Sequence, residues 1–364
     1  MKARKDILFL GLHRPSRSPS QRYRIEQFLP YLKEEGLSYD YDYLLSEEMD
    51  RVFYSPGALL GKAWLVVKSI IKLCYIAFVK SKDFHYVFVQ REAFMLGTAF
   101  FEKVIAKRSK LIFDFDDSIW MPNVSEANKK LSFLKNPNKV KEIIEKAHYN
   151  VTGNLFLSNY ASQYSNNVMQ IPTCVDTYEY QRSSPLKPKQ NGRVCIGWSG
   201  SQTTIEHFKL AQPVLSAIKK KYGDKVYFKV LGDGDYSNEE LNIQGVKWER
   251  KTEIQELEEL DIGIMPLPND EWSKGKCGLK GLVYMSMEIP SILADVGVNA
   301  EIIQDGVNGY LCANSREWQE KLSLLIENEA LRETFGKLGR ETILDKYSIL
   351  ANKEGLINLI RDEK

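Results

Sequence analysis

A glycine-rich loop in the C-terminal half of the chain, GKCGLKG beginning at Gly275, combines residue types that suit phosphate binding. Gly275 and Gly278 would let the backbone approach a ligand closely. A helix predicted from about Leu279 would direct its N–H groups and the positive end of its dipole at the same loop. Lys276 and Lys280 would add two mobile positive charges. We therefore predict that a diphosphate binds at this helix start, next to the two lysines.

A second phosphate-binding turn is predicted at SGSQTT, which contains Gly200 and Ser201 and follows a buried strand. Thr203 and Glu206 have the spacing of a capping box, so a helix should begin beside the turn. A strand, a Gly/Ser turn and a capped helix start can together hold a phosphate group without a lysine. The same diphosphate is therefore expected to contact Gly200 and Ser201.

Charged residues also follow two neighbouring strands predicted in the N-terminal half. Arg91 and Glu92 follow one strand, and Asp116 and Asp117 follow the next. Ligands of doubly wound parallel sheets bind outside the carboxyl ends of the strands. A carboxylate there can orient an acceptor hydroxyl or share its proton, so Asp116, Arg91 and Glu92 are the catalytic candidates. Asp117 is either part of this site or a cap of the next turn.

Two further interpretations concern the same half of the chain. Asp114 and Asp116 form a D-x-D pair, whose paired carboxylates could bind Mn²⁺ or Mg²⁺ because hard cations prefer oxygen ligands. We disfavour a metal site because the C-terminal half is predicted to be a second nucleotide-binding domain. Arginines follow the first predicted strand, and Arg14 and Arg22 are candidates for an acceptor or a phosphate, although a solvated loop is an alternative.

The loop that begins at Gly275 continues into a longer signature. K-x-x-x-YM-x-x-x-IP from Lys280, then V-G-V-N-x-E-I-I and D-G-x-N-G-Y-L, resembles the C-terminal signature of retaining glycosyltransferases of family 4, which have the GT-B fold. The resemblance implies that the second half binds a nucleotide-sugar donor and that no metal ion or other cofactor takes part. The family usually has two glutamates that hold the ribose and the donor sugar. Gly275 and Val283 stand in their places, so the chain resembles a divergent branch.

The resemblance also implies roles for other residues. The segment GVKWER resembles the part of the family that contacts the nucleotide base, so Trp248 and Glu249 are candidates for base and ribose binding. A tryptophan that ends a strand is as often a core residue. Glu271, at the entry to the glycine-rich loop, is a candidate substitute for the missing glutamates. In many family members a histidine–acid pair stands where this chain has Asp116 and Asp117.

Mostly apolar strands that alternate with helices predict an α/β fold with doubly wound parallel sheets. Together with the resemblance, this predicts GT-B architecture, with two Rossmann-like domains and a cleft between them. The expected divisions are an acceptor-side domain (1–185), a nucleotide-sugar-binding domain (186–340) and a C-terminal helix that crosses back (341–364). A linker rich in Pro, Lys and Gly is predicted at 183–192. Lysine-rich exposed helices are predicted at 122–146, and they include Lys139.

Charge is distributed unevenly along the 364 residues. Residues 1–190 contain 28 Lys/Arg and 20 Asp/Glu, whereas the remainder contains 22 and 28. A basic first half favours an anionic acceptor or a membrane surface, although solvated surfaces often differ by this much. A nearly all-apolar segment, 63–79, is interrupted by lysines and is too short to span a bilayer, so a helix packed on the sheet is preferred to one lying on lipid. Five unpaired cysteines suit a reducing cytoplasm.

The predicted reaction is transfer of a sugar from a nucleotide-diphosphate-sugar to a hydroxyl of a glycan or lipid-linked acceptor, with retention and without a metal. The predicted location is the cytoplasm, with peripheral contact at the inner face of the membrane, and no nucleic-acid partner is expected. A nucleotide-sugar 2-epimerase and a non-catalytic nucleotide- or sugar-binding relic are the alternatives. The small number of histidines, four in the chain, disfavours the epimerase.

Overall fold

The computed structural model describes residues 4–55, 57–121, 136, 138–183 and 192–361. Contacts between residues divide the chain into two compact units. The first unit consists of Met1–Thr173 and Asn352–Lys364, and the second of Cys174–Ala351. Residues 184–191, which make up most of the predicted linker, and residues 122–135 and 137 of the lysine-rich stretch lie outside the described residues.

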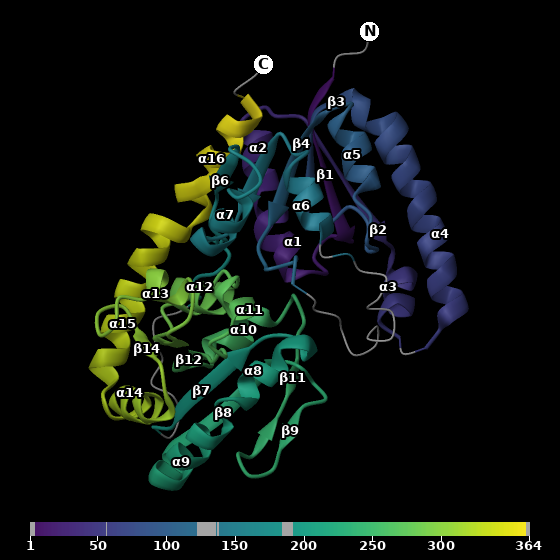
Figure 1. The fold of residues 1–364 in the computed structure, drawn as a ribbon. Helices are drawn as coiled ribbons and strands as arrows, with labels where there is room; N and C mark the ends of the chain where they lie inside the picture. The colour runs from purple at the N-terminus through teal and green to yellow at the C-terminus, as the bar shows by residue number, and fades with distance from the viewer. Residues whose placement is uncertain (1–3, 56, 122–135, 137, 184–191, 362–364) are drawn as a thin grey trace. The chain divides into compact units, whose positions relative to one another are not determined.

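The first unit contains a six-stranded parallel sheet with the order β2-β1-β3-β4-β5-β6 (Figure 1). Its strands are β1 (Lys5–His13), β2 (Tyr39–Leu45), β3 (Phe84–Gln90), β4 (Lys110–Phe115), β5 (Tyr149–Thr152) and β6 (Val168–Gln170). The middle strands are continuous apolar runs, and β1 and β3 are almost wholly buried. Such runs are typical of a parallel sheet that is covered on both faces.

Helices connect these strands. They are α1 (Pro19–Arg24), α2 (Leu29–Glu34), α3 (Glu47–Tyr54), α4 (Leu59–Tyr75), α5 (Phe100–Ala106), α6 (Asn138–Ile144) and α7 (Leu155–Ala161), with short turns η1 (Glu26–Phe28), η2 (Ile76–Lys80) and η3 (Ser81–Asp83). Figure 1 shows α4 and α5 beside each other along one side of the sheet. α5 begins at Phe100, ten residues after the end of β3.

The second unit contains another six-stranded parallel sheet, with the order β11-β8-β7-β12-β13-β14, and a small antiparallel pair. Its strands are β7 (Val194–Ser199), β8 (Val226–Gly232), β11 (Val246–Lys247), β12 (Ile262–Met265), β13 (Ser291–Ala294) and β14 (Tyr310–Cys312), with β9 (Ser237–Asn238) and β10 (Ile243–Gln244) as the pair. The two parallel sheets confirm the predicted α/β fold class.

The helices of this unit are α8 (Ile205–Lys209), α9 (Gln212–Tyr222), α10 (Glu253–Glu258), α11 (Glu271–Lys274), α12 (Leu279–Ser286), α13 (Asn299–Ile302), α14 (Ser315–Glu327) and α15 (Glu329–Thr342), with short turns η5 (Gln202–Thr204), η6 (Gly223–Lys225) and η7 (Ile343–Tyr347). α16 (Ile349–Arg361) begins in the second unit, and its residues from Asn352 onwards belong to the first.

One helix start differs from the prediction. The capping box is formed by Ser201 and Thr204, not by Thr203 and Glu206, because the chain begins a 3₁₀ turn two residues earlier. At α14, Asn314 is the cap, and its side chain accepts hydrogen bonds from the next turn.

Lys139 was predicted to be exposed, and the structure shows that prediction to be wrong. Its side chain is 1% exposed, and Nζ donates to the carbonyls of Phe94 at 2.5 Å and Leu96 at 3.1 Å. Glu92 lies 3.3 Å from the same nitrogen and buried Glu102 lies 3.9 Å away. A lysine can be buried when carbonyls and carboxylates replace its water, and charge counting along the sequence does not detect such partners.

The long helix α4 packs through one face only. Leu65, Ser69 and Leu73 are buried, while most of its remaining apolar side chains are exposed. The predicted packing on the sheet therefore accounts for one side of the helix. No helix in the part of the chain that the structure describes has both the length and the hydropathy needed to cross a bilayer.

Candidate functional site

In the first unit, Arg91 joins the two aspartates predicted beside it. Its Nε donates to Asp116 Oδ1 at 2.9 Å and its Nη2 donates to Asp117 Oδ2 at 2.6 Å. Arg91 follows β3 directly and has a positive φ of 64°, which is uncommon for a residue with a side chain. Its backbone N–H donates to the carbonyl of Asp114 in the neighbouring strand. The carboxyl ends of β3 and β4 thus place the guanidinium between two carboxylates.

A chain of hydrogen bonds supports Asp116 from a third element. Ser20, on α1, donates to Asp116 Oδ2 at 2.5 Å, and Gln90 donates to Ser20 Oγ at 2.5 Å. Burial by itself would raise the pKa of Asp116, but the positive charge of Arg91 and the Ser20 hydroxyl outweigh burial and lower it. Asp116 is therefore an ionised carboxylate whose partners hold it in one orientation.

Asp114, the first residue of the D-x-D pair, has a different partner. Its carboxylate accepts two hydrogen bonds from Arg24 Nε, at 3.1 and 3.2 Å, and a third from Arg24 Nη2. Burial raises the pKa of Asp114 to about 6, while the charge of Arg24 opposes the rise. Arg24 Nη1 also donates to the carbonyl of Ile171. This pair therefore ties α1 to β4 inside the unit.

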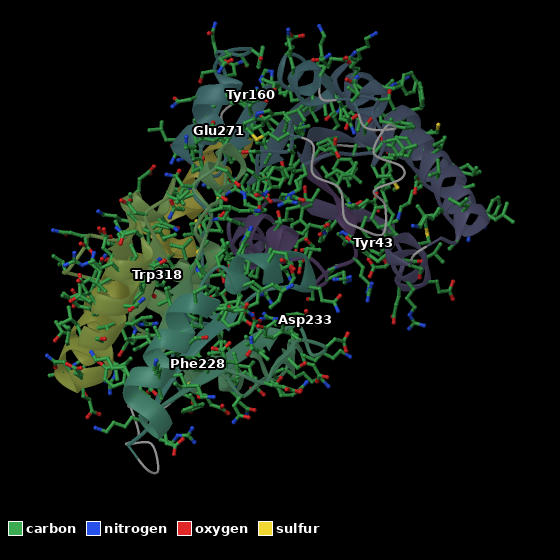
Figure 2. The ribbon with its side chains drawn as sticks, turned by 60° about the horizontal axis from the view of Figure 1, so that its bottom comes forward. Tyr43, Tyr160, Phe228, Asp233, Glu271 and Trp318 are labelled. Carbon is green, nitrogen blue, oxygen red and sulfur yellow. The ribbon has the colours of Figure 1, made fainter. Side chains whose placement is uncertain are left out.

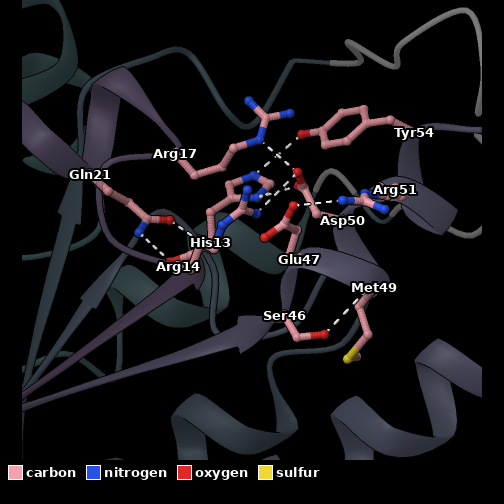
Figure 3. Close-up of polar contacts among 10 residues, drawn as sticks. All are labelled: His13, Arg14, Arg17, Gln21, Ser46, Glu47, Met49, Asp50, Arg51 and Tyr54. Carbon is pink, nitrogen blue, oxygen red and sulfur yellow. Dashed lines mark hydrogen bonds and ion pairs between the residues drawn. The ribbon is translucent and has the colours of Figure 1, made fainter. Parts of the chain in front are cut away.

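A second polar cluster, which the sequence analysis did not find, lies at the end of β1 (Figure 3). We call His13, Asp50, Arg14, Arg17 and Tyr54 the His13 cluster. His13 Nδ1 lies 3.2 Å from Asp50 Oδ1 and its Nε2 lies 3.3 Å from the Tyr54 hydroxyl. Arg17 Nε donates to Asp50 Oδ2 at 2.6 Å, and Arg14 Nη1 lies 3.5 Å from the same oxygen.

The electrostatics of the His13 cluster connect it to Arg91. The pKa of His13 is lowered to about 4, first by burial and then by the charges of Arg17 and Arg91, against the effect of Asp50. Burial is also the main cause of the raised pKa of Tyr54. His13 is therefore neutral at pH 7. His13 ends β1 and Arg91 follows the neighbouring strand β3, so the His13 cluster and the Arg91–Asp116 pair lie at the same edge of the sheet, at the carboxyl ends of β1, β3 and β4. We call the two groups together the polar site.

The remaining candidates of this unit have other partners. Glu92 pairs with buried Lys139, 3.3 Å away. Arg22 is buried on α1, where Nη2 donates to the Tyr23 hydroxyl at 3.1 Å. Arg14 and Asp117, in contrast, both belong to the polar site. The signal that could have revealed the His13 cluster is weak, because Asp50 is 37 residues away from His13 in the sequence.

In the second unit, the turns after β7 and β8 cross at very close range. The N–H of Gly200 donates to the carbonyl of Leu231 at 2.8 Å. A Cβ on Gly232, whose φ is 125°, would lie 1.7 Å from the carbonyl oxygen of Gly200. A Cβ on Gly200 would meet the ring of Trp198 at 2.2 Å. Both glycines are therefore required by the turn itself, which positions the capped start of η5 at the end of β7.

Asp233 follows β8 and lies beside this turn. Figure 2 labels it together with Phe228, which is within the strand. Gln202, the residue after Ser201, donates from Nε2 to Asp233 Oδ1 at 3.5 Å and to Asp235 Oδ2 at 3.3 Å. The turn is thus held from both sides, by the Gly200–Leu231 hydrogen bond and by these side chains.

Helix α12 begins at Leu279, as predicted from the glycine-rich loop. Its N-cap is Gly278, which has a φ of 68°, and among the described residues no side chain caps the helix. The positive φ favours glycine here, and a Cβ on Gly278 would lie 2.3 Å from Ile302 Cδ1, so that side chain would also have to shift. The free N–H groups of a helix start suit an anion.

The two lysines predicted for this helix start lie against tryptophans. Lys280 Nζ is 5.3 Å from the centre of the Trp198 ring, and Lys276 Nζ is 5.0 Å from that of Trp272. Trp198 belongs to β7, so Lys280 connects α12 with the strand that precedes the Gly200 turn. Tyr284 strengthens this connection, because its hydroxyl accepts the N–H of Ser199 at 2.7 Å. The two phosphate-binding elements predicted separately therefore lie at the same edge of the second sheet, beyond the carboxyl ends of β7 and β12.

The candidates for base and ribose binding, Trp248, Glu249 and Glu271, lie on separate segments of the second unit. Glu271 starts α11 and forms an ion pair with Lys274. Glu249 is exposed, and Trp248 is half-buried. Gly275 ends α11, and Val283 is buried within α12. Within the described ranges, no group of three or more His, Cys, Asp or Glu residues is arranged to hold a metal ion.

Comparisons with known proteins agree with this geometry. Residues 194–328, which lie within the second unit, match the family model described as glycosyl transferases group 1. No curated protein sequence matches the chain. A region that matches this model therefore contains the Gly200 turn, the α12 start and both lysines.

Solved structures with similar folds include three that differ in length. A glycosyltransferase from Rickettsia africae is 13% identical over 98% of each chain, with a TM-score of 0.69. Anabaena HepE in complex with UDP and glucose is 14% identical over 98% of this chain and 99% of its own, with a TM-score of 0.64. TarM of S. aureus is 19% identical over 80% of this chain, with a TM-score of 0.62, and the match spans 58% of TarM. At these identities the likeness shows the fold, which is that of GT-B glycosyltransferases.

Proposed function

We propose that the protein is a glycosyltransferase that moves a sugar from a nucleotide-diphosphate-sugar to a hydroxyl of a glycan or lipid-linked acceptor. One observation carries this proposal. In the region that matches the group 1 model, α12 begins at a glycine cap that no side chain of the described residues caps, and Lys280 of its first turn reaches back to Trp198 in the strand before the Gly200 turn.

The donor would be bound by the second unit. A diphosphate between the Gly278 helix start and the Ser201 turn would receive backbone N–H groups from both, with Lys276 and Lys280 to balance its charge. Negative charge grows on the leaving phosphate as the glycosidic bond breaks, so the same groups would stabilise the transition state. Because HepE was solved with UDP and glucose, UDP is the first nucleotide to test.

The acceptor would be bound by the first unit. Asp116 is ionised and held by Arg91 and Ser20, which suits a group that orients a hydroxyl or takes up part of its proton. We also propose retention of configuration, membership of family 4 and a reaction without a resident metal ion. Asp114 supports the last point, since its carboxylate is occupied by Arg24. The five cysteines are free thiols, which supports a cytoplasmic location.

The donor site is tested by thermal unfolding with UDP, GDP, ADP and dTDP. One nucleotide should raise the melting temperature of the second unit, and Lys276→Ala/Lys280→Ala should weaken its binding by about 30-fold or more, because each lysine loses a charge-assisted contact. A matched control is Lys220→Ala/Lys337→Ala, which removes two exposed lysines from the same unit. Equal binding by the two double variants would contradict the proposed diphosphate site.

The acceptor site is tested by Asp116→Asn, which keeps the size of the side chain and removes its charge. Transfer should fall by about 100-fold or more, while nucleotide binding should not change, since the donor is held by the second unit. Asp117→Asn also loses a contact with Arg91 but none with Ser20, so it should lower the rate of transfer by a smaller factor. If both variants retain full transfer, Asp116 has no role in the reaction.

Incubation with a nucleotide-sugar, with and without an acceptor, distinguishes the alternatives. A nucleotide-sugar 2-epimerase would interconvert the sugar without an acceptor, and the neutral His13 beside Asp50 is the observation that favours such acid–base chemistry. A non-catalytic relic would bind a nucleotide and form no product. Product that appears only when an acceptor is added, and that persists in EDTA, supports the proposed transferase.

A further inference from the structure

The outer face of α4 carries a row of exposed apolar side chains. Its members follow one another at helical spacing and are between 40% and 90% exposed: Leu60, Trp64, Val67, Ile71, Tyr75 and, in the following turn, Phe78. Buried Leu65 and Leu73 hold the opposite face of the helix. Surface helices of globular proteins normally expose polar residues, so this apolar row indicates a partner outside the described chain.

The charged side chains within the segment that forms this row all have one sign. Residues 59–82 contain five lysines and no aspartate or glutamate. Lys68 is exposed within the row, with Nζ 5.5 Å from the centre of the Trp64 ring, and Lys82 is exposed just beyond it. Lys72 and Lys80 are half-buried, and Lys80 pairs with Asp42 at 2.9 Å. The exposed face of α4 is therefore apolar and basic.

A basic hollow adjoins the C-terminal end of the row. It has a volume of about 400 Å³. Among the described residues that line it, seven are basic and none is acidic: Arg4, His85, Lys107, Arg108, Lys110, Lys146 and His148. Arg108 connects the hollow with the row, because its guanidinium lies 5.4 Å from the centre of the Phe78 ring. The pKa of His148 is lowered, first by burial and then by the charge of Lys110.

We propose that the outer face of α4 and the adjoining basic hollow bind the surface of an anionic lipid bilayer. Trp64, Ile71 and Tyr75 would enter the boundary between headgroups and acyl chains, and the surrounding lysines and Arg108 would contact lipid phosphates. A second copy of this face fits less well, since it would bring two sets of lysines together. This inference does not depend on the proposed transferase activity.

The experiment is flotation of the full-length protein with phosphatidylcholine vesicles and with vesicles that contain about 30% phosphatidylglycerol. We expect binding to the anionic vesicles that weakens at high salt. Trp64→Ser/Ile71→Ser should reduce binding at least about tenfold, because it removes two of the three side chains proposed to enter the bilayer. Lys107→Ala/Arg108→Ala should reduce binding to anionic vesicles by about tenfold and weaken its dependence on salt.

Leu155→Ser/Leu324→Ser is the matched control, since both leucines are exposed to a similar degree elsewhere on the molecule. It should bind like the wild type, and thermal unfolding should show that all variants fold. Equal flotation of the control and the Trp64/Ile71 variant, or no binding to anionic vesicles, overturns the proposal. So does a wild-type dimer in sedimentation that Trp64→Ser/Ile71→Ser dissociates, which would assign the face to a second copy. Stabilisation by nucleotide should be the same in every variant, so a failure of lipid binding is distinguishable from a failure of the donor site.

Discussion

At the scale of single residues, the polar site of the first unit depends on a few charges that offset one another. Arg91 holds Asp116 and Asp117, and Arg24 holds Asp114. His13 stays neutral although Asp50 is next to it, because burial and two nearby arginines disfavour a third positive charge. The site thus combines the ionised carboxylate of Asp116 with the neutral imidazole of His13, and either type of group can transfer a proton to or from a hydroxyl.

The pKa of His13 predicts a pH dependence of stability. It falls from the ordinary 6.5 in the unfolded chain to about 4 in the folded protein. Between these values the unfolded chain binds a proton that the folded chain does not, so this contribution to stability is complete above pH 6.5 and is lost as the pH falls toward 4. The wild type should lose about 3 kcal/mol more than His13→Gln between pH 7 and pH 4.

Urea unfolding of the two proteins at several pH values measures that difference. His148→Gln serves as the control, because His148 is only partly buried. Parallel stability curves for wild type and His13→Gln would show that His13 is protonated in the folded protein as readily as in the unfolded chain.

At the scale of elements, the site of the second unit depends on two helix starts and a crossing of two turns. α12 begins where Gly278 adopts a positive φ, and the turn after β7 can approach the turn after β8 only because Gly200 and Gly232 lack side chains. Neither requirement involves a ligand. The elements are therefore positioned by packing, and any phosphate would be held by backbone groups that the fold has already oriented.

The turn crossing predicts the effect of Gly232→Ala. The new Cβ would overlap the carbonyl of Gly200. The alanine would also have to adopt the φ of 125° that Gly232 has. The variant should lose about 3 kcal/mol or more of stability, and its nucleotide binding should weaken with the displaced turn. Gly306→Ala is a suitable comparison, since its φ is also positive at 75° but nothing lies within 4 Å of the added carbon. Gly306→Ala should lower the free energy of unfolding by about 1 to 2 kcal/mol. Calorimetry that gives equal losses would mean that the turns do not approach as described.

At the scale of the whole molecule, the chain builds two units of the same design and returns to the first at its end. Residues 352–364 cluster with the first unit although α16 starts in the second. Leu356, Ile357 and Ile360 are buried, and Arg361 pairs with Glu35 at 2.8 Å. The last helix is therefore part of the core of the first unit.

Removal of residues 352–364 should accordingly destabilise the first unit and leave the second folded. Loss of several fully buried aliphatic side chains costs about 1.5 to 3 kcal/mol each, which approaches the whole stability of a domain. Calorimetry of the shortened protein should show one transition strongly lowered or lost, and a nucleotide should still raise the other. A thermogram identical to that of the full chain would show that α16 contributes little to the first unit.

Some of the candidate site could be predicted from local sequence because its cause is local. The glycine-rich loop, the helix start at Leu279 and the turn at Gly200 follow from residues within a few positions of each other. The pairing of Arg91 with Asp116 could also be predicted, because the two residues follow adjacent strands of a parallel sheet. The His13 cluster was not, because α3 brings Asp50 to β1 only after the chain has formed a second strand.

The sequence by itself determined the alternation of strands and helices, the apolar strands of two parallel sheets, and the glycine positions where helices and turns could begin. Each of these depends on neighbours along the chain, through hydrophobic period and backbone freedom. Only the tertiary structure decided which charges meet, that Lys139 is buried while Trp64 is exposed, and that Glu92 pairs with Lys139. Those outcomes depend on which segments pack together, because burial and pairing are set by neighbours in space.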